Sequence, residues 1–125
     1  MREIVRTDRA PDDVGPFSQA VRANGFLFVS GQIPMDPTTR ELSRGDLAEQ
    51  AELVLRNLQA VLEAGGSSLE RVVKVGVFLK DMDQFSLFNE VYARFFPAPR
   101  PARTTVEAAR LPKEILVEID AIALA

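Results

Sequence analysis

Arg103 and Glu118 are the two residues of this sequence best suited to chemistry. Each lies in a stretch near the C-terminus that is otherwise mostly apolar or small, at residues 101–106 and 116–121. Charged side chains in such stretches are usually paired or used, because an isolated buried charge is costly. A planar guanidinium can bind two carboxylate oxygens at once, and a neighbouring carboxylate can orient water and pass protons. The pair therefore indicates either a site for a small carboxylic acid or a structural ion pair that supports a sheet or a subunit contact.

The composition limits what such a site can use. None of the 125 residues is cysteine or histidine, which excludes disulfides, cysteine nucleophiles, the usual general base and the commonest metal ligands. We therefore expect no metal, and chemistry carried by carboxylates, Arg, Lys, hydroxyls, backbone groups or water. The net charge of −3 provides no broad basic surface, so we do not expect nucleic acid as a partner. No secretory signal and no run of roughly 20 apolar residues is recognisable, which favours a cytoplasmic protein without a membrane span.

Three strands are expected in the N-terminal part of the chain. The first is short, at residues 4–7, and a turn-rich stretch follows it. Residues 20–24 and 26–32 read as two further strands joined at Asn24-Gly25, a dipeptide that suits a tight hairpin turn because both residues tolerate positive φ. The second of these begins with a continuous apolar run, which predicts a strand covered on both faces. At Ser30-Gly31 the pattern changes, and there either a ligand touches the backbone or the strand simply ends or bulges.

Two helices are predicted by apolar residues at helical spacing. The longer one begins after Asp46, a capping residue with Glu49 three positions on, and ends at Gly65-Gly66. Its apolar face consists of Leu47, Ala51, Val54, Leu55, Leu58, Val61 and Leu62. The shorter helix runs from about residue 85 to 96, and its core-facing stripe consists of Phe85, Phe88, Val91, Tyr92 and Phe95. Asn89, at one edge of this stripe, is polar and therefore a candidate site residue.

The remaining residues predict three more strands and the fold class. Residues 72–79 form a β-branched apolar strand, so that strand, long helix and strand make a crossover unit with parallel strands. Residues 103–108 and 115–124 are expected to be extended, with a turn near 111–113. We therefore expect a single domain over residues 1–125 in the α/β (α+β) class, with a mixed β-sheet and two helices packed on one face.

The geometry between Arg103 and Glu118 depends on the turn that joins their strands. Alternate side chains of a strand point to the same face, and Glu118 shares its face mainly with apolar residues. A hairpin centred between residues 110 and 111 would set Arg103 directly opposite Glu118, with Thr105 on the same face as Arg103. A turn shifted toward Pro112 would break this register. Burial of the face would raise the pKa of Glu118, and a cation beside it would lower that pKa.

Beyond these patterns, the sequence resembles the reactive-intermediate deaminase family (Rid, formerly YjgF), and most closely its RidA-type members. The resemblance runs nearly end to end, with motif blocks in the same order and at the same spacing. The blocks are Gly15-Pro16-Phe17-Ser18-Gln19-Ala20, Ser30-Gly31-Gln32-Ile33-Pro34, Phe88-Asn89-Glu90-Val91-Tyr92, Pro101-Ala102-Arg103-Thr104-Thr105-Val106, Leu111-Pro112-Lys113 and Val117-Glu118-Ile119-Asp120-Ala121. Each block alone is a modest signal, whereas their order and spacing together are specific.

This resemblance implies a chorismate-mutase-like fold, assembled as a homotrimer with active sites in the clefts between subunits. It implies hydrolysis of reactive 2-imino or enamine acids, such as 2-iminopropanoate and 2-iminobutanoate, to 2-keto acids and ammonia, without a cofactor. The absence of cysteine and histidine agrees with a reaction that needs neither a metal nor a covalent nucleophile.

The resemblance also implies roles for individual residues. Arg103 matches the arginine that binds the substrate carboxylate, and Glu118 matches the carboxylate that orients the attacking water. The other matching positions line the pocket: Gly31 and Thr105 around the carboxylate, and Ser30 and Asn89 elsewhere.

Two positions depart from the family pattern. Many members have tyrosine where this chain has Phe17, so any task of the phenol hydroxyl is lost, although Phe17 can still wall the pocket and exclude water. Thr105 stands where several members have cysteine, so a thiol is dispensable. Two alternatives to the deaminase remain open: a non-catalytic regulatory trimer that binds small carboxylates, and a nuclease or translation inhibitor, an activity attributed to some relatives.

Overall fold

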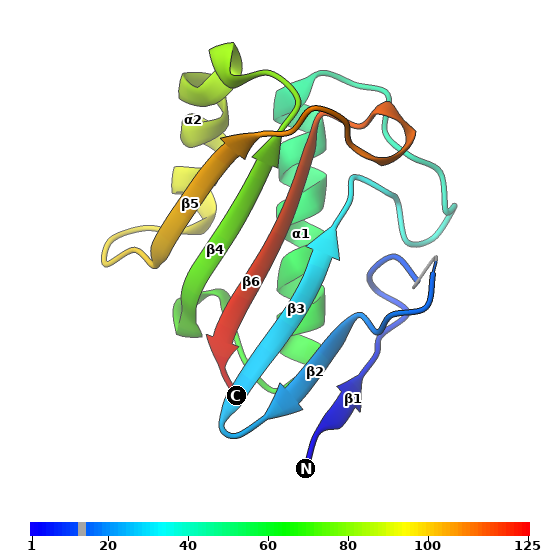
Figure 1. Ribbon diagram of the computed structural model, residues 1–125, viewed down its shortest axis with the longest axis vertical. Helices are drawn as coiled ribbons and strands as arrows, with labels where there is room; N and C mark the ends of the chain where they lie inside the picture. The colour runs from blue at the N-terminus through cyan, green and yellow to red at the C-terminus, as the bar shows by residue number, and fades with distance from the viewer. Residues whose placement is uncertain (13–14) are drawn as a thin grey trace.

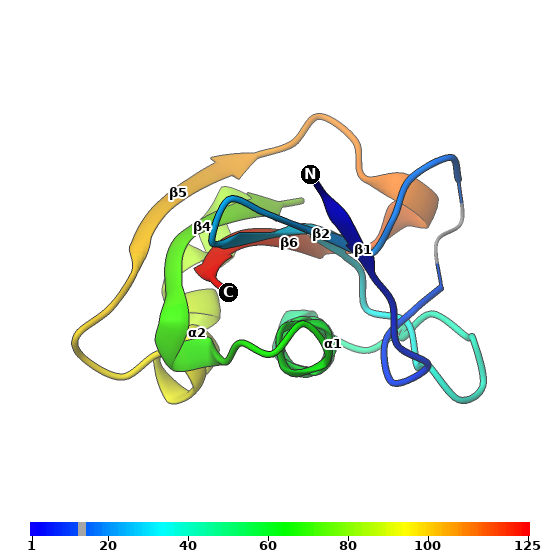
Figure 2. The same cartoon turned by 90° about the horizontal axis from the view of Figure 1, so that it is seen from below.

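In the part of the chain that the structure describes, six strands form one mixed β-sheet, and two α-helices lie across one of its faces (Figures 1 and 2). The computed structural model describes residues 1–12 and 15–125, so part of the turn-rich stretch after the first strand lies outside the described residues. The strands are β1 (Glu3–Val5), β2 (Ala20–Ala23), β3 (Phe26–Gln32), β4 (Val72–Leu79), β5 (Ala102–Glu107) and β6 (Val117–Leu124). The helices are α1 (Leu47–Ala64) and α2 (Phe85–Phe95). Both helices lie below the sheet in Figure 2, which confirms the predicted fold class.

The hairpin of β2 and β3 forms where Asn24-Gly25 predicts it. Asn24 has a φ of 55° and Gly25 a φ of 83°, the left-handed conformation that this tight turn needs. On its other side β3 pairs antiparallel with β6, so β3 lies inside the sheet. Leu27 and Val29 are buried against the helices, whereas Phe28 faces the opposite side of the sheet and is 45% exposed.

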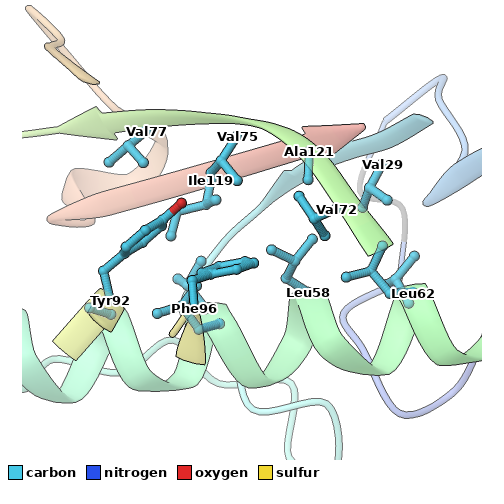
Figure 3. Packing of buried hydrophobic residues seen from close by; sticks show 14 of the residues in the cluster. Val29, Leu58, Leu62, Val72, Val75, Val77, Tyr92, Phe96, Ile119 and Ala121 are labelled. Carbon is cyan, nitrogen blue, oxygen red and sulfur yellow. The ribbon is translucent and has the colours of Figure 1, made fainter. Parts of the chain in front are cut away.

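α1 begins and ends as the sequence predicts. The Asp46 side chain accepts a hydrogen bond from the backbone N–H of Glu49 at 3.0 Å, and the chain leaves the helix at Gly65. The predicted apolar face is fully buried. In Figure 3, Leu58 and Leu62 lie under the side chains of the sheet, where they pack in the hydrophobic core. This packing fixes α1 beneath β3 and β6.

α2 packs beside α1 and buries part of its predicted stripe. Phe88, Val91 and Tyr92 are buried, but Phe85 is 38% exposed. The prediction for Phe85 is therefore wrong: its ring lies 5.4 Å from the guanidinium carbon of Arg103 and stacks on that group instead of entering the core. In the part of the chain that the structure describes, no helix is long and apolar enough to cross a membrane.

The predicted hairpin between β5 and β6 is wrong, because β4 lies between them. β4 pairs in parallel with β5 and antiparallel with β6. α2 supplies the crossover that the parallel pair requires. After β5 the chain passes through a short 3₁₀ turn at Pro112–Glu114 and enters the sheet on the far side of β4. β6 thereby gains two long antiparallel partners, and β3 and β4 run parallel to each other, as the predicted crossover unit requires.

β3 bulges at Ser30-Gly31. Val29 lies opposite Ala121 and Gln32 lies opposite Ile119, so two residues of β3 face the single residue Asp120 of β6. A bulge was one of the alternatives that the sequence allowed at this position, and the structure contains it. Such bulges redirect the local backbone, and here the redirected backbone lies against Glu118.

Candidate functional site

Arg103 and Glu118 point to opposite faces of the sheet. Arg103 pairs with Val75, which is fully buried on the helix-covered face. Glu118 pairs with Phe78, whose side chain points away from the face that buries Val77. The predicted juxtaposition of the two charges within one chain is therefore wrong, because it depended on the β5–β6 hairpin. The chain carries two half-sites instead, each beside its own cavity.

The arginine half-site consists of Arg103 and the side chains of α2 that hold it. Nη2 of Arg103 donates a hydrogen bond to Oδ1 of Asn89 at 2.7 Å. The guanidinium carbon lies 5.5 Å from the ring centre of Phe88 and 4.6 Å from that of Tyr92, and Phe85 completes the set of rings. Cation–π contacts of this kind contribute about 0.5–2 kcal/mol each. The guanidinium is therefore held in one place by uncharged groups.

The charge of Arg103 is left uncompensated by this arrangement. Within residues 1–12 and 15–125, no carboxylate forms a salt bridge with it. It borders a cavity of about 330 Å³ that Asn89, Tyr92 and Arg100 also line. A half-buried guanidinium with uncharged partners and an adjacent cavity is suited to bind an incoming carboxylate.

The glutamate half-site lies on the other face and combines Glu118 with Gly31, Ser30 and Phe17. These residues line a cavity of about 270 Å³, whose remaining wall is largely apolar. Gly31 leaves the space that the carboxylate occupies, because a Cβ added there would lie 2.0 Å from Oε2 of Glu118. The Ser30 hydroxyl donates to the carbonyl of Ser18 at 2.6 Å, which holds the bulge in place. Phe17 is 49% exposed at the cavity wall.

The surroundings of Glu118 raise the pKa of its carboxyl group above the ordinary value. Burial raises the pKa of its carboxyl group, and the negative charge of Asp120 raises that pKa further. Arg103 does not lower this pKa, because it lies on the other face of the sheet. A carboxyl group whose pKa lies nearer neutrality is a better acid or base at cellular pH.

The structure divides the predicted site residues between the half-sites. Asn89 lies with Arg103, whereas Phe17, Ser30 and Gly31 lie with Glu118. Thr105 pairs with Val77 and so points to the same face as Arg103, but it does not line the arginine cavity. Gly31 and Thr105, which the resemblance places around one carboxylate, are therefore on different faces.

Sequence reasoning assigns no functional contact to Tyr92 or Asp120, although both lie beside the candidate site residues. The helical stripe assigns Tyr92 to the core, yet its ring stacks on Arg103 and its buried hydroxyl has no hydrogen-bond partner within the described residues. Burial raises the pKa of this phenol, although Arg103 and Arg100 act against the shift. The available signal was spacing: Tyr92 follows Asn89 by three positions on α2, and Asp120 follows Glu118 by two on β6.

The fold and the two half-sites define an α+β protein of a known family. The family model described as Endoribonuclease L-PSP matches residues 7–125. The chain therefore belongs to this family, the YjgF/Rid family, as its motif blocks predict.

Individual relatives match along nearly the whole chain. The RutC family protein PH0854 of Pyrococcus horikoshii is 53% identical over 123 residues, which cover 98% of both chains. Reactive Intermediate Deaminase A, a chloroplastic protein of Arabidopsis thaliana, is 41% identical over 98% of this chain and 65% of its own length. This relationship supports a general deaminase function for the chain.

Solved structures agree with the fold. TM0215 of Thermotoga maritima has 54% sequence identity and a TM-score of 0.97, covering 100% of this chain and 98% of its own. E. coli TdcF, whose crystal structure contains bound serine, has 42% identity and a TM-score of 0.93, with 98% of both chains covered.

Proposed function

We propose that this protein is a deaminase that hydrolyses small 2-imino and enamine acids, such as 2-iminopropanoate and 2-iminobutanoate, to 2-keto acids and ammonia. The observation that carries the proposal is the uncompensated guanidinium of Arg103, held by Asn89 and three aromatic rings beside a cavity. A relative named as a deaminase and a structural neighbour with bound serine, itself a small amino acid, support the same ligand class.

The proposal requires that two copies of the chain share a site. Arg103 and Glu118 lie on opposite faces of one sheet, so a single chain does not bring both to one substrate. We infer a homotrimer in which the arginine half-site of one copy meets the glutamate half-site of its neighbour. The helix-free face supports this assembly, because it exposes apolar side chains that a partner would cover. These are Phe26, Phe28, Val106 and Leu124.

In the proposed mechanism Arg103 binds the substrate carboxylate and Glu118 of the neighbouring copy binds a water molecule. Glu118 accepts a proton as the water oxygen bonds to the carbon of the protonated imine and the C=N π electrons move to nitrogen, which gives a neutral carbinolamine. Glu118 then returns this proton to nitrogen. The C–N bond breaks and ammonia leaves, while the hydroxyl oxygen forms the C=O bond and gives its proton to Glu118. An imine hydrolyses unaided, so orientation and a modest fall in the barrier suffice; each tenfold in rate needs about 1.4 kcal/mol.

The direct test measures 2-keto acid and ammonia released from 2-iminopropanoate generated in the assay. Arg103→Lys keeps the charge but loses the planar fork, so kcat/KM should fall about 10- to 100-fold, equivalent to a charged hydrogen bond of about 1.5–3 kcal/mol. Unchanged turnover by a correctly assembled Arg103→Lys variant would refute the role of Arg103 as a carboxylate clamp.

Two other functions give different results in the same experiments. A regulatory trimer that only binds small carboxylates would retain ligand without releasing ammonia. Phe17 favours this alternative, because it lacks the phenol hydroxyl that many family members carry at this position. An endoribonuclease, the activity after which the family is described, would cleave RNA. The net charge of −3 and the lack of histidine argue against the nuclease. RNA cleavage that persists after removal of contaminating activity would reverse this preference.

A further inference from the structure

Two carboxylates lie side by side on the helix-free face, and each occupies a gap left by a glycine. Glu118 and Asp120 are alternate residues of β6 and point to the same face. Glu118 fills the space above Gly31 of β3. Asp120 fills the space above Gly76 of β4, where an added Cβ would lie 2.3 Å from Oδ1 of Asp120. The two glycines therefore permit two acidic side chains to pack against the sheet at neighbouring positions.

The surroundings make this a place where two negative charges interact. Neither carboxylate forms a salt bridge within the described part of the chain. On the Asp120 side, Lys74 of β4 is the nearby cation, and its Nζ donates to Oγ1 of Thr104 on β5 at 2.6 Å. On the Glu118 side, the charged residues that line the cavity are Asp12 and Lys113, while β3 contributes Ser30 and Gly31 and β4 contributes Phe78.

We propose that Asp120 is a positioning residue for Glu118: seated over Gly76, it keeps a second negative charge beside Glu118 and so strengthens the hold of Glu118 on the proton it takes from water. This inference deepens the proposed deaminase function and rests on it. Asp120 itself touches no substrate in this account, and it acts only through Glu118.

The titration of the two groups agrees with the geometry. Burial raises the pKa of Asp120, and contact with the Gly76 backbone and the charge of Lys74 oppose that rise. The net effect is a raised pKa for Asp120 as well, and the negative charge of its ionised form raises the pKa of Glu118. A base gains strength as its pKa approaches the working pH, which is the condition for efficient proton transfer.

The test compares two substitutions of Asp120 by the pH dependence of kcat/KM. Asp120→Asn keeps the shape and removes the charge, whereas Asp120→Glu keeps the charge and changes the shape. If Glu118 must be ionised to act, activity is lost as pH falls through its raised pKa. Asp120→Asn lowers that pKa, so the acid limb should move to lower pH and the plateau kcat should fall. The fall should be smaller than the roughly 10²- to 10⁴-fold contribution of an acid–base group itself. Asp120→Glu should keep the acid limb near that of the parent.

A matched control separates local from general electrostatics. Glu52→Gln removes one negative charge from the exposed face of α1, where Glu52 forms an ion pair with Arg56 at 3.5 Å, and should leave the pH profile unchanged. An acid limb of Asp120→Asn that coincides with the parent's, or that shifts equally in Glu52→Gln, would overturn the proposal. So would the reverse ranking, with Asp120→Asn harmless and Asp120→Glu damaging, because that result indicates a purely structural role.

A second measurement needs neither a variant nor deaminase activity. Carboxyl ¹³C resonances of the parent protein, followed by NMR from acid to neutral pH, should show Glu118 and Asp120 titrating as a coupled pair, each sensing the other's step. Independent single-step titrations would overturn the coupling even if imine hydrolysis is confirmed. Conversely, if the two groups titrate as a coupled pair but the protein has no deaminase activity, the coupling between Glu118 and Asp120 is supported and only the proposed function is contradicted.

Discussion

Asn89→Asp tests whether Arg103 binds substrate because its charge is uncompensated. The substitution places a carboxylate oxygen where the amide oxygen now accepts a hydrogen bond from Nη2 of Arg103 at 2.7 Å. The shape of the side chain is kept, so the neighbouring rings need not move. The guanidinium would gain a permanent anionic partner that competes with the substrate carboxylate.

The magnitude follows from the position of the pair. Two unit charges about 4 Å apart attract by about 4 kcal/mol at an effective dielectric constant of about 20. Arg103 is only half-buried, so solvent screening reduces this value, and about 1–2 kcal/mol is a reasonable net figure. That energy corresponds to a change of about 5- to 30-fold in an equilibrium constant.

The assay follows initial rates with 2-iminopropanoate together with thermal unfolding. KM should rise by about 5- to 30-fold while the melting temperature stays the same or rises, because the new ion pair stabilises the fold as it blocks the site. Arg94→Gln is the control, since it changes the net charge by the same amount at an exposed position of α2. A KM of Asn89→Asp within twofold of the control would refute the reasoning about Arg103.

Three other substitutions test the glutamate half-site. Glu118→Gln should slow hydrolysis and keep ligand binding. A carboxyl group with a raised folded-state pKa stabilises the fold below its unfolded pKa of about 4.3 and loses that contribution as pH rises. The Glu118→Gln variant should therefore unfold at a higher temperature than the parent at pH 7, and the difference should be smaller at pH 4. Parent-like rates for Glu118→Gln would remove Glu118 from the mechanism. Gly31→Ala forces the Glu118 carboxylate to move, so kcat should fall by about 100-fold, and a fully active variant would show that its position is unimportant. Phe17→Tyr restores the hydroxyl common in the family at an exposed wall position; kcat should rise while the free energy of unfolding changes by less than about 0.5 kcal/mol, and an unchanged kcat would show that the hydroxyl has no task here.

Local sequence signals predicted the elements of the fold well. The cap at Asp46, the turn at Asn24-Gly25 and the apolar spacing along α1 are each decided by residues a few positions apart, and the structure contains all three. The order of strands was not predicted, because β5 and β6 are neighbours in sequence while β4 enters between them from a distant part of the chain. No local sequence pattern indicates that β4 lies between β5 and β6.

The same limit explains what was missed in the site. Arg103 and Glu118 were identified by type and surroundings, but their faces depend on which strands they pair with, and those pairings are long-range. The contact of Asp120 with Gly76 also joins residues far apart in sequence, and the contact of Tyr92 with Arg103 joins a helix to a strand. The bulge at Ser30-Gly31 was among the expected alternatives, yet only the register with β6 distinguishes it from a strand end.

The most direct test of the central claim, a site completed between copies of the chain, is a complementation experiment. Arg103→Ala and Glu118→Gln variants, each expected to have little activity alone, are mixed in equal amounts, unfolded and refolded together. If each site takes Arg103 from one copy and Glu118 from its neighbour, random assembly of cyclic trimers leaves about one quarter of the sites intact. We predict recovery of about one quarter of the parent activity on 2-iminopropanoate. Refolded trimers that contain both variants and still release no ammonia would contradict the shared site.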